Sequence, residues 1–159
     1  MPSFVIEIYS DGSCHTQYKI GAWAAILLIG NSEIILKGEA QNTTHNRMEL
    51  MAVIKAIEYA DKNYKNTPLT IYIDSQYVSR IPERKVKLKS NHYQTNKKIA
   101  IQNVDLVKKL IYQIETHSVE FIKVKAHQKF KKDEHVNYNS AADKLARQIV
   151  REAVKLLHQ

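Results

Sequence analysis

The chain has 159 residues, of which 44% are hydrophobic and 25% are charged, a balance that is ordinary for a soluble globular domain with a sizeable core. No apolar run approaches the roughly 20 residues that cross a bilayer, so the composition argues against a membrane protein. The net charge of +8 favours a polyanionic partner.

The start of the chain and its cysteine content indicate the compartment. The first predicted strand begins almost at the N-terminus, which leaves no room for a signal peptide. Cys14 is the only cysteine, so an intrachain disulfide is excluded and a reducing environment is expected. We therefore expect a cytoplasmic protein, and a monomer.

The first predicted strand, Phe4–Cys14, is the one around which the others are arranged. Apolar residues occupy both of its faces, which is typical of a strand in the middle of a covered sheet. The strand is expected to deliver Asp11 into a turn at Gly12-Ser13. Taken alone, such a triplet is more often a plain turn than part of a metal site.

The remaining elements follow from the spacing of the apolar residues. They are, in order, strands at Ile20–Ile29 and Glu33–Ala40 joined by the turn Gly30-Asn31-Ser32, a helix at Arg47–Tyr59, a strand at Leu69–Asp74, a short helix broken at Pro82, a helix near Ile101–Glu115, a strand at Val119–Lys125 and a helix at Asn139–Leu157 whose inward set includes Leu156. Three strands followed by strand–helix alternation predict a five-stranded mixed sheet, antiparallel and then parallel, with helices on both faces. We expect one α/β domain over residues 1–159.

The positive charge is concentrated in two segments. Residues 80–98 carry six of the eight net positive charges, and a second group, Lys123 to Lys132, precedes Asp133 and Glu134. Runs of charge are usually solvated surfaces, but this clustering favours a surface that binds phosphates.

Four acidic residues stand at strand ends or at the margins of buried helix stripes: Asp11, Glu49, Asp74 and Asp143. Each has a plain alternative, since Asp74 could cap a helix, Glu49 could be solvated and Asp143 could pair with Arg147. Together they would repel one another without cations, and clustered carboxylates suit Mg²⁺ or Mn²⁺. A basic protein with an acidic metal pocket fits the cleavage of phosphodiesters.

Several short motifs, in this order, resemble the successive motifs of type 1 ribonuclease H. They are Asp11-Gly12-Ser13, Asn46-Arg47-Met48-Glu49-Leu50, Asp74-Ser75-Gln76-Tyr77-Val78, Asn103-Val104-Asp105-Leu106, Val124-Lys125-Ala126-His127 and Asn139 with Asp143-Lys144-Leu145-Ala146-Arg147. The set covers nearly the whole chain and is specific, although each motif alone would be weak. The resemblance implies a ribonuclease H fold and hydrolysis of the RNA strand of RNA–DNA hybrids, which leaves 5′-phosphate and 3′-hydroxyl ends.

The resemblance also implies roles for individual residues. The four acids match metal-binding carboxylates, which would hold two Mg²⁺ ions, or Mn²⁺ in their place, when substrate is bound. His127 matches a mobile histidine that assists proton transfer or product release. The implied substrate contacts are Cys14, Thr44, Asn46, Gln76 and Asn139, with Lys85, Lys87 and Lys89 in a basic protrusion at residues 80–98.

The chain departs from the family pattern in four places. The turn after the first motif, His15–Ile20, lacks the usual glycines, and His45 stands where many members have Asn. Ala126 replaces a glycine, and the loop at Gln128–Tyr138 is longer than usual. Other functions stay open from sequence: a non-catalytic hybrid-binding module, another metal nuclease of the same broad fold, or a structural protein that binds polyanions.

Overall fold

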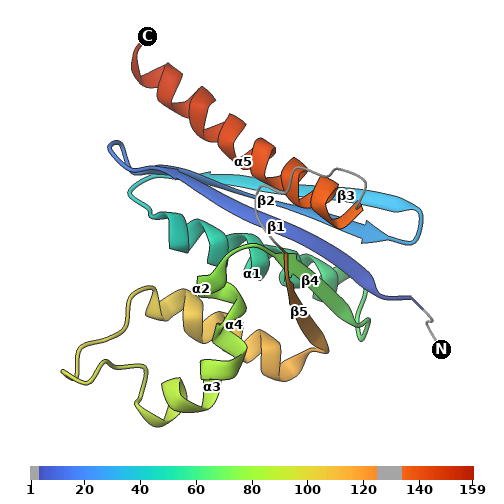
Figure 1. Ribbon diagram of the computed structural model, residues 1–159, viewed down its shortest axis with the longest axis vertical. Coiled ribbons are helices and arrows are strands. Elements are labelled where there is room, and N and C mark those ends of the chain that lie inside the picture. Colours follow the sequence, from blue (N-terminus) through green and yellow to red (C-terminus); the bar gives the residue numbers. More distant parts are fainter. Residues whose placement is uncertain (1–3, 125–133) are drawn as a thin grey trace.

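β1 (Ile6–His15) lies at the centre of the sheet because both of its faces are apolar and both are covered (Figure 1). The computed structural model describes residues 4–124 and 134–159. Its five strands run in the order β3-β2-β1-β4-β5. β2 (Ile20–Ile29) and β3 (Ser32–Ala40) are antiparallel to their neighbours, whereas β4 (Leu69–Ile73) and β5 (Val119–Lys123) are parallel. The predicted fold class is confirmed.

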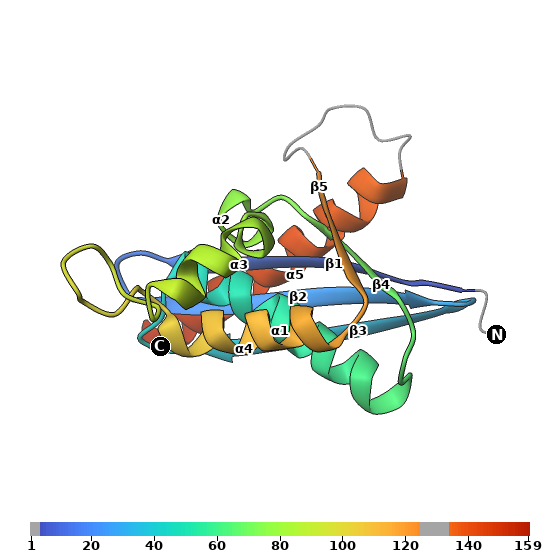
Figure 2. The ribbon, with the colours of Figure 1, turned by 90° about the horizontal axis from the view of Figure 1, so that it is seen from below.

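Helices cover both faces of the sheet, as Figure 2 shows. They are α1 (His45–Asn63), α2 (Gln76–Ser79), α3 (Ile81–Ser90), α4 (Val104–Thr116) and α5 (Glu134–Leu157). One face packs on α1 through residues such as Ile8 and Leu27, and α4 packs in turn against α1. The other packs on α5, where Tyr9 and Ile26 contact Ala142. No helix among the described residues combines the length and apolar character that crossing a membrane requires.

The sequence prediction was wrong about both ends of the first strand. Phe4 and Val5 precede β1 and are 40% and 45% exposed. Gly12-Ser13 is not a turn, since Gly12 pairs with Trp23 and the ladder with β2 continues to His15. The parallel partner β4 pairs only up to Tyr72, opposite Tyr9, so Asp11 lies where β1 has already passed the end of that ladder.

The helix ends differ from the prediction because of their caps. Thr44 accepts a hydrogen bond from the Arg47 backbone N–H at 3.2 Å, so α1 begins two residues earlier than predicted. Ser75, and not Asp74, caps α2, because its hydroxyl accepts from Val78 N–H at 3.2 Å. Pro82 lies in the first turn of α3, a helix that the sequence reading missed.

The last helix begins earlier than predicted, at Glu134, and one expected core residue is not in the core. Leu156 is 68% exposed, although it follows the same apolar stripe as the buried Ala146 and Ala153. Figure 1 shows the reason, since the C-terminal turns of α5 extend beyond the sheet. The described part of the last strand ends at Lys123 rather than Lys125, which lies outside the described residues.

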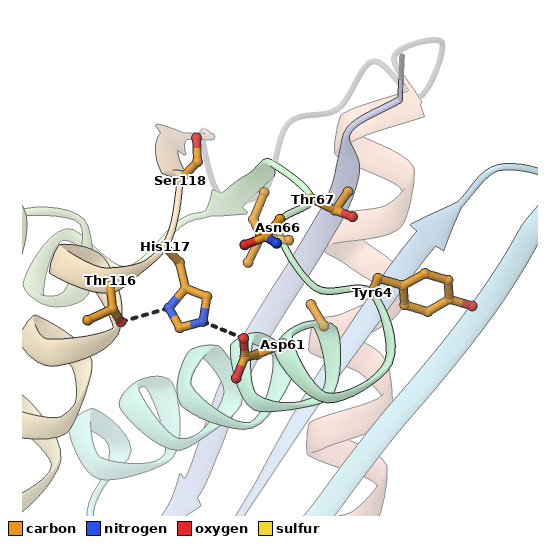
Figure 3. A pocket seen from close by; sticks show the side chains of 9 residues that line it. Asp61, Tyr64, Asn66, Thr67, Thr116, His117 and Ser118 are labelled. Carbon is orange, nitrogen blue, oxygen red and sulfur yellow. Dashed lines mark hydrogen bonds and ion pairs between the residues drawn. The ribbon is translucent and has the colours of Figure 1, made fainter. Parts of the chain in front are cut away.

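The C-terminal ends of α1 and α4 are tied by a histidine. His117 Nε2 lies 2.9 Å from Asp61 Oδ1, and its Nδ1 lies 3.0 Å from Thr116 Oγ1 (Figure 3). These residues line a cavity of about 220 Å³ next to Leu69, at the start of β4. Because Asp74 follows the opposite end of β4, this cavity is not part of the predicted metal site.

Gly12→Ala should lower the free energy of unfolding by about 3 kcal/mol or more. A Cβ at Gly12 would lie 2.5 Å from the backbone nitrogen of Glu49 and from the carbonyl carbon of Met48, and helix backbone cannot rotate aside. Gly30→Ala is the control, since open space surrounds it and only its φ of +59° resists a side chain; we expect a loss of about 1 kcal/mol. Urea denaturation measures both, and equal losses would contradict the close approach of α1 to β1.

Candidate metal centre

Three carboxylates from different elements meet beyond the end of the parallel ladder. Asp11 on β1, Glu49 on α1 and Asp74 after β4 each place an oxygen within 4.8 Å of the others. Asp143 on α5 lies near them, since its carboxyl group raises the pKa of Asp11, Glu49 and Asp74. The structure therefore clusters three of the four acids that the sequence singled out and places the fourth, Asp143, near them.

Backbone geometry holds these side chains in place. Gly12 N–H donates to Asp11 Oδ1 at 2.9 Å, and the missing side chain of Gly12 lets the Met48–Glu49 backbone approach β1. Asn139, on the buried face of α5, hydrogen-bonds to Asp74. Each acid is thus fixed by the element that carries it or by a neighbouring element.

Burial makes this cluster costly in the absence of a cation. Asp11 is 3% and Glu49 1% exposed, and Glu49 Oε2 has no hydrogen-bond partner among residues 4–124 and 134–159. Burial raises the pKa of Asp11 far above its ordinary value, and the neighbouring Glu49 carboxyl group raises it further. Burial also raises the pKa of Glu49 to about 7, against an opposing hydrogen bond with Asp11. Burial raises the pKa of Asp74 as well, although the hydrogen bond from Asn139 opposes this change.

Such a donor set fits a hard divalent cation. The clustered ligands are carboxylate oxygens from three different parts of the fold, and among the described residues the buried amide oxygen of Asn139 has no hydrogen-bond partner. A divalent ion would offset both the burial of these carboxylates and their mutual repulsion, which raise the pKa values. The arrangement has the chemistry of a magnesium or manganese site.

Two basic side chains contact the acids from the solvent side. His45 Nε2 lies 3.2 Å from Glu49 Oε1, and the histidine side chain is 62% exposed. Arg147 Nε lies 3.1 Å from Asp143 Oδ1, so the ion pair foreseen as an alternative role for Asp143 coexists with its place in the cluster. The His45 contact was missed, although the i,i+4 spacing of His45 and Glu49 could have indicated it.

Another pair missed from sequence connects two of the motifs. The guanidinium of Arg47 donates to Asp105 Oδ1 and Oδ2 at 3.0 and 2.9 Å. This two-point contact fixes the first turn of α1 against the start of α4, and it raises the pKa of Arg47. It holds the helix that carries Glu49.

The predicted substrate contacts surround the acids. Cys14 is half-buried on β1, where burial raises the pKa of its thiol. Thr44 and Asn46 line a groove of about 420 Å³ with Gln102 and Asn103, from the start of α4. Gln76 is the first residue of α2 and lies two residues after Asp74.

The three predicted lysines of the protrusion lie on α3, but they differ in their contacts. Lys89 forms an ion pair with Glu115 at 2.8 Å. Lys85 and Lys87 form no ion pair within the described residues. Tyr93 has one ring face covered by Lys108, whose Nζ is 5.1 Å from the ring centroid. His127 and the lysines at 125–132 lie outside the described residues.

Without metal, the acid cluster predicts a stability that falls as pH rises. The pKa values of Asp11 and Glu49 are raised in the folded state, so the folded chain holds protons that the unfolded chain releases above about pH 4. The associated stability is therefore present at low pH and is lost as pH rises above about 4, through about 7 for Glu49 and further still for Asp11, whose pKa is raised more.

Asp11→Asn should relieve this loss, because the amide can still accept the Gly12 N–H without carrying charge. We expect the variant to be more stable than the parent at pH 8 in EDTA, by on the order of 1–3 kcal/mol, and equal to it near pH 4. Urea denaturation across this pH range measures the difference, with Glu33→Gln, at an exposed position on β3, as control. A variant that loses stability at pH 8 would argue against crowded carboxylates.

Comparison with known proteins agrees with these observations. The family model described as RNase H matches residues 4–151. The ribonuclease H of Caldicellulosiruptor saccharolyticus is 34% identical over 149 residues, which cover 92% of this chain and 97% of that protein.

Solved structures share the fold. LC9-RNase H1, described as a type 1 RNase H with the type 2 active-site motif, superposes with a TM-score of 0.79 at 21% identity, covering 96% of this chain and 74% of that one. The foamy viral protease-reverse transcriptase in complex with RNA/DNA hybrid superposes with a TM-score of 0.74 at 20% identity, covering 91% of this chain and 20% of that one. Fold, clustered acids and sequence lead to one conclusion: the chain belongs to the ribonuclease H family.

Proposed function

We propose that this enzyme hydrolyses the RNA strand of RNA–DNA hybrids with two Mg²⁺ ions, or Mn²⁺ in their place, held by the four acids when the hybrid is bound. The observation that carries the proposal is the meeting of Asp11, Glu49 and Asp74 within 4.8 Å, in a member of the ribonuclease H family. Metal ions bound there would supply an activated water and would stabilise the leaving 3′ oxygen.

The chain's own groups prepare this chemistry. Burial of Asp11 and Glu49 keeps bulk water from their carboxylates and strengthens their hold on a cation. The hydrogen bond from Asn139 orients Asp74, as outer-sphere partners do at metal sites. Asp143, exposed on one side and paired with Arg147, closes the cluster from α5.

Hybrid selectivity is proposed to come from groups that flank the acids. Asn46 and Gln76 would contact the minor groove, where a 2′-hydroxyl distinguishes RNA from DNA. Thr44 would contact a DNA-strand phosphate through its hydroxyl, which accepts the cap hydrogen bond from Arg47 N–H and can still donate its own proton. Cys14 would lie near the nucleic acid, without a catalytic role. His127 is proposed to assist proton transfer or product release.

The protrusion at residues 80–98 is proposed to grip the hybrid through phosphates. Lys85 and Lys87 would contribute more than Lys89, because the Lys89 ammonium already binds Glu115. We propose that residues 1–159 act as one ribonuclease H domain, as a monomer and in the cytoplasm, where a chain with one cysteine needs no oxidising environment.

The test is cleavage of a hybrid whose RNA and DNA strands carry different labels. The parent should cut internal RNA bonds only when Mg²⁺ is present and leave the DNA intact. Asp74→Asn should lower kcat by about 10³-fold or more, because the metal site supplies several kcal/mol of transition-state stabilisation. Hybrid binding should survive.

Asp61→Asn is the matched control, since it removes the same charge at the far end of α1. Its kcat should equal that of the parent. Binding of the hybrid without any metal-dependent cleavage would favour the non-catalytic module, and cleavage of duplex DNA would favour another nuclease of this fold.

A further inference from the structure

A groove of about 450 Å³ leads away from the acids along α5. It is lined on one side by Gly12–His15 of β1 and by His45, and on the other by Asp143, Arg147, Val150 and Arg151 of α5. We call it the α5 groove. Its first part adjoins the metal centre through Asp143, and its outer part is formed by Arg151 and the end of β1.

The charges along the groove change sign with distance from the acids. Asp143, Arg147 and Arg151 follow one another at four-residue spacing, so they share one stripe of α5 and extend over about 12 Å. Arg147 is committed to Asp143 at 3.1 Å. Arg151 forms no hydrogen bond or ion pair within the part of the chain that the structure describes. The outer part of the groove therefore holds an exposed cation whose charge is not neutralised.

The opposite wall is held in place and offers further donors. His15 Nδ1 accepts the Tyr18 N–H at 3.2 Å, which places the proton of the neutral ring on Nε2. The His15 ring packs on Tyr18 with centroids 4.9 Å apart, and the Tyr18 hydroxyl lies 3.3 Å from His158 Nε2 at the end of α5. This contact joins the β1–β2 turn to α5 and fixes the width of the groove's outer part.

We propose that the α5 groove holds the backbone of the RNA strand two to four nucleotides from the cleaved bond, with Arg151 binding one of its phosphates. The proposal rests on the proposed function. The strand whose phosphate lies at the acids is the one that continues into an adjoining groove, and 12 Å corresponds to about three to four steps of 3.4 Å along a duplex axis. An unpaired arginine suits a phosphate, and the His15 N–H and Ser13 hydroxyl suit its oxygens.

The experiment removes the phosphate charge at one position at a time. Hybrids carrying a single neutral methylphosphonate in the RNA strand, at each of five positions on either side of the cut site, are titrated in the Asp74→Asn background. One position two to four nucleotides from the cut should weaken binding about fivefold, the range of an exposed ion pair. Adding Arg151→Gln should abolish the effect there and leave the other positions unchanged.

The control is Lys65→Gln, which removes the same charge on the exposed α1–β4 connection, at the other end of the sheet. It should leave the effect of the methylphosphonate on binding unchanged at every position. In a plot of log K against log salt concentration, Arg151→Gln should lower the slope by about one unit. For this variant, a hybrid whose contacted phosphate is neutral should lower the slope no further. Equal thermal stability of the variants excludes a folding effect.

Two failures are distinguishable. If Arg151→Gln changes the effect of the methylphosphonate equally at all positions, or at none, the α5 groove is not a subsite for the RNA strand, whatever the catalytic activity. If the unaltered chain does not cleave hybrids with Mg²⁺, the proposed function fails, and that result is read before any Arg151 variant is made.

Discussion

The constraint on which the structure depends is the burial of like charges where β1 and α1 touch. Gly12 has no side chain, so the backbone at Met48 and Glu49 comes close enough that a Cβ would lie 2.5 Å away. That approach puts two buried carboxylates, Asp11 and Glu49, beside each other, and the pKa of each is raised by burial. A fold optimised for stability alone would place apolar groups here, because buried charges without partners are expensive. A bound cation would offset this cost and so explains why acids occupy these buried positions.

The rest of the molecule supports that contact from both sides of the sheet. From below the sheet, Arg47 and Asp105 hold the start of α1 against α4. From above, Tyr9 stacks on Tyr72 at 4.7 Å and on Tyr138 at 5.2 Å, which packs the first turns of α5 against β1 and β4. The same turns carry Asn139 to Asp74 and Asp143 to Asp11. Aromatic packing and ion pairs therefore surround the acids and offset the repulsion between them.

The sequence was enough for the sheet and for the choice of the four acids, because both rest on patterns of a few residues. Apolar runs located β1, β2 and β4, and the acids stood at the margins of those runs or of helix stripes. The predictions that failed were those of features that depend on tertiary contacts. A Gly-Ser pair usually ends a strand, but β2 continues the ladder through Gly12 to His15. Leu156 fits the apolar stripe of α5 and is exposed because the sheet ends before it. The contact of Arg47 with Asp105 needed the relative placement of α1 and α4, which no local pattern supplies, whereas the i,i+4 contact of His45 with Glu49 lay within reach of the sequence.

The central claim is that these acids form one divalent metal site, and a crystal soaked in Mn²⁺ tests it most directly. An anomalous difference map is sensitive to manganese and independent of any activity. The account predicts a peak at coordination distance, about 2 Å, from carboxylate oxygens of Asp11, Glu49 and Asp74, and its loss in Asp11→Asn crystals. Manganese bound elsewhere, with these carboxylates carrying no peak at a concentration that saturates other sites, would contradict it.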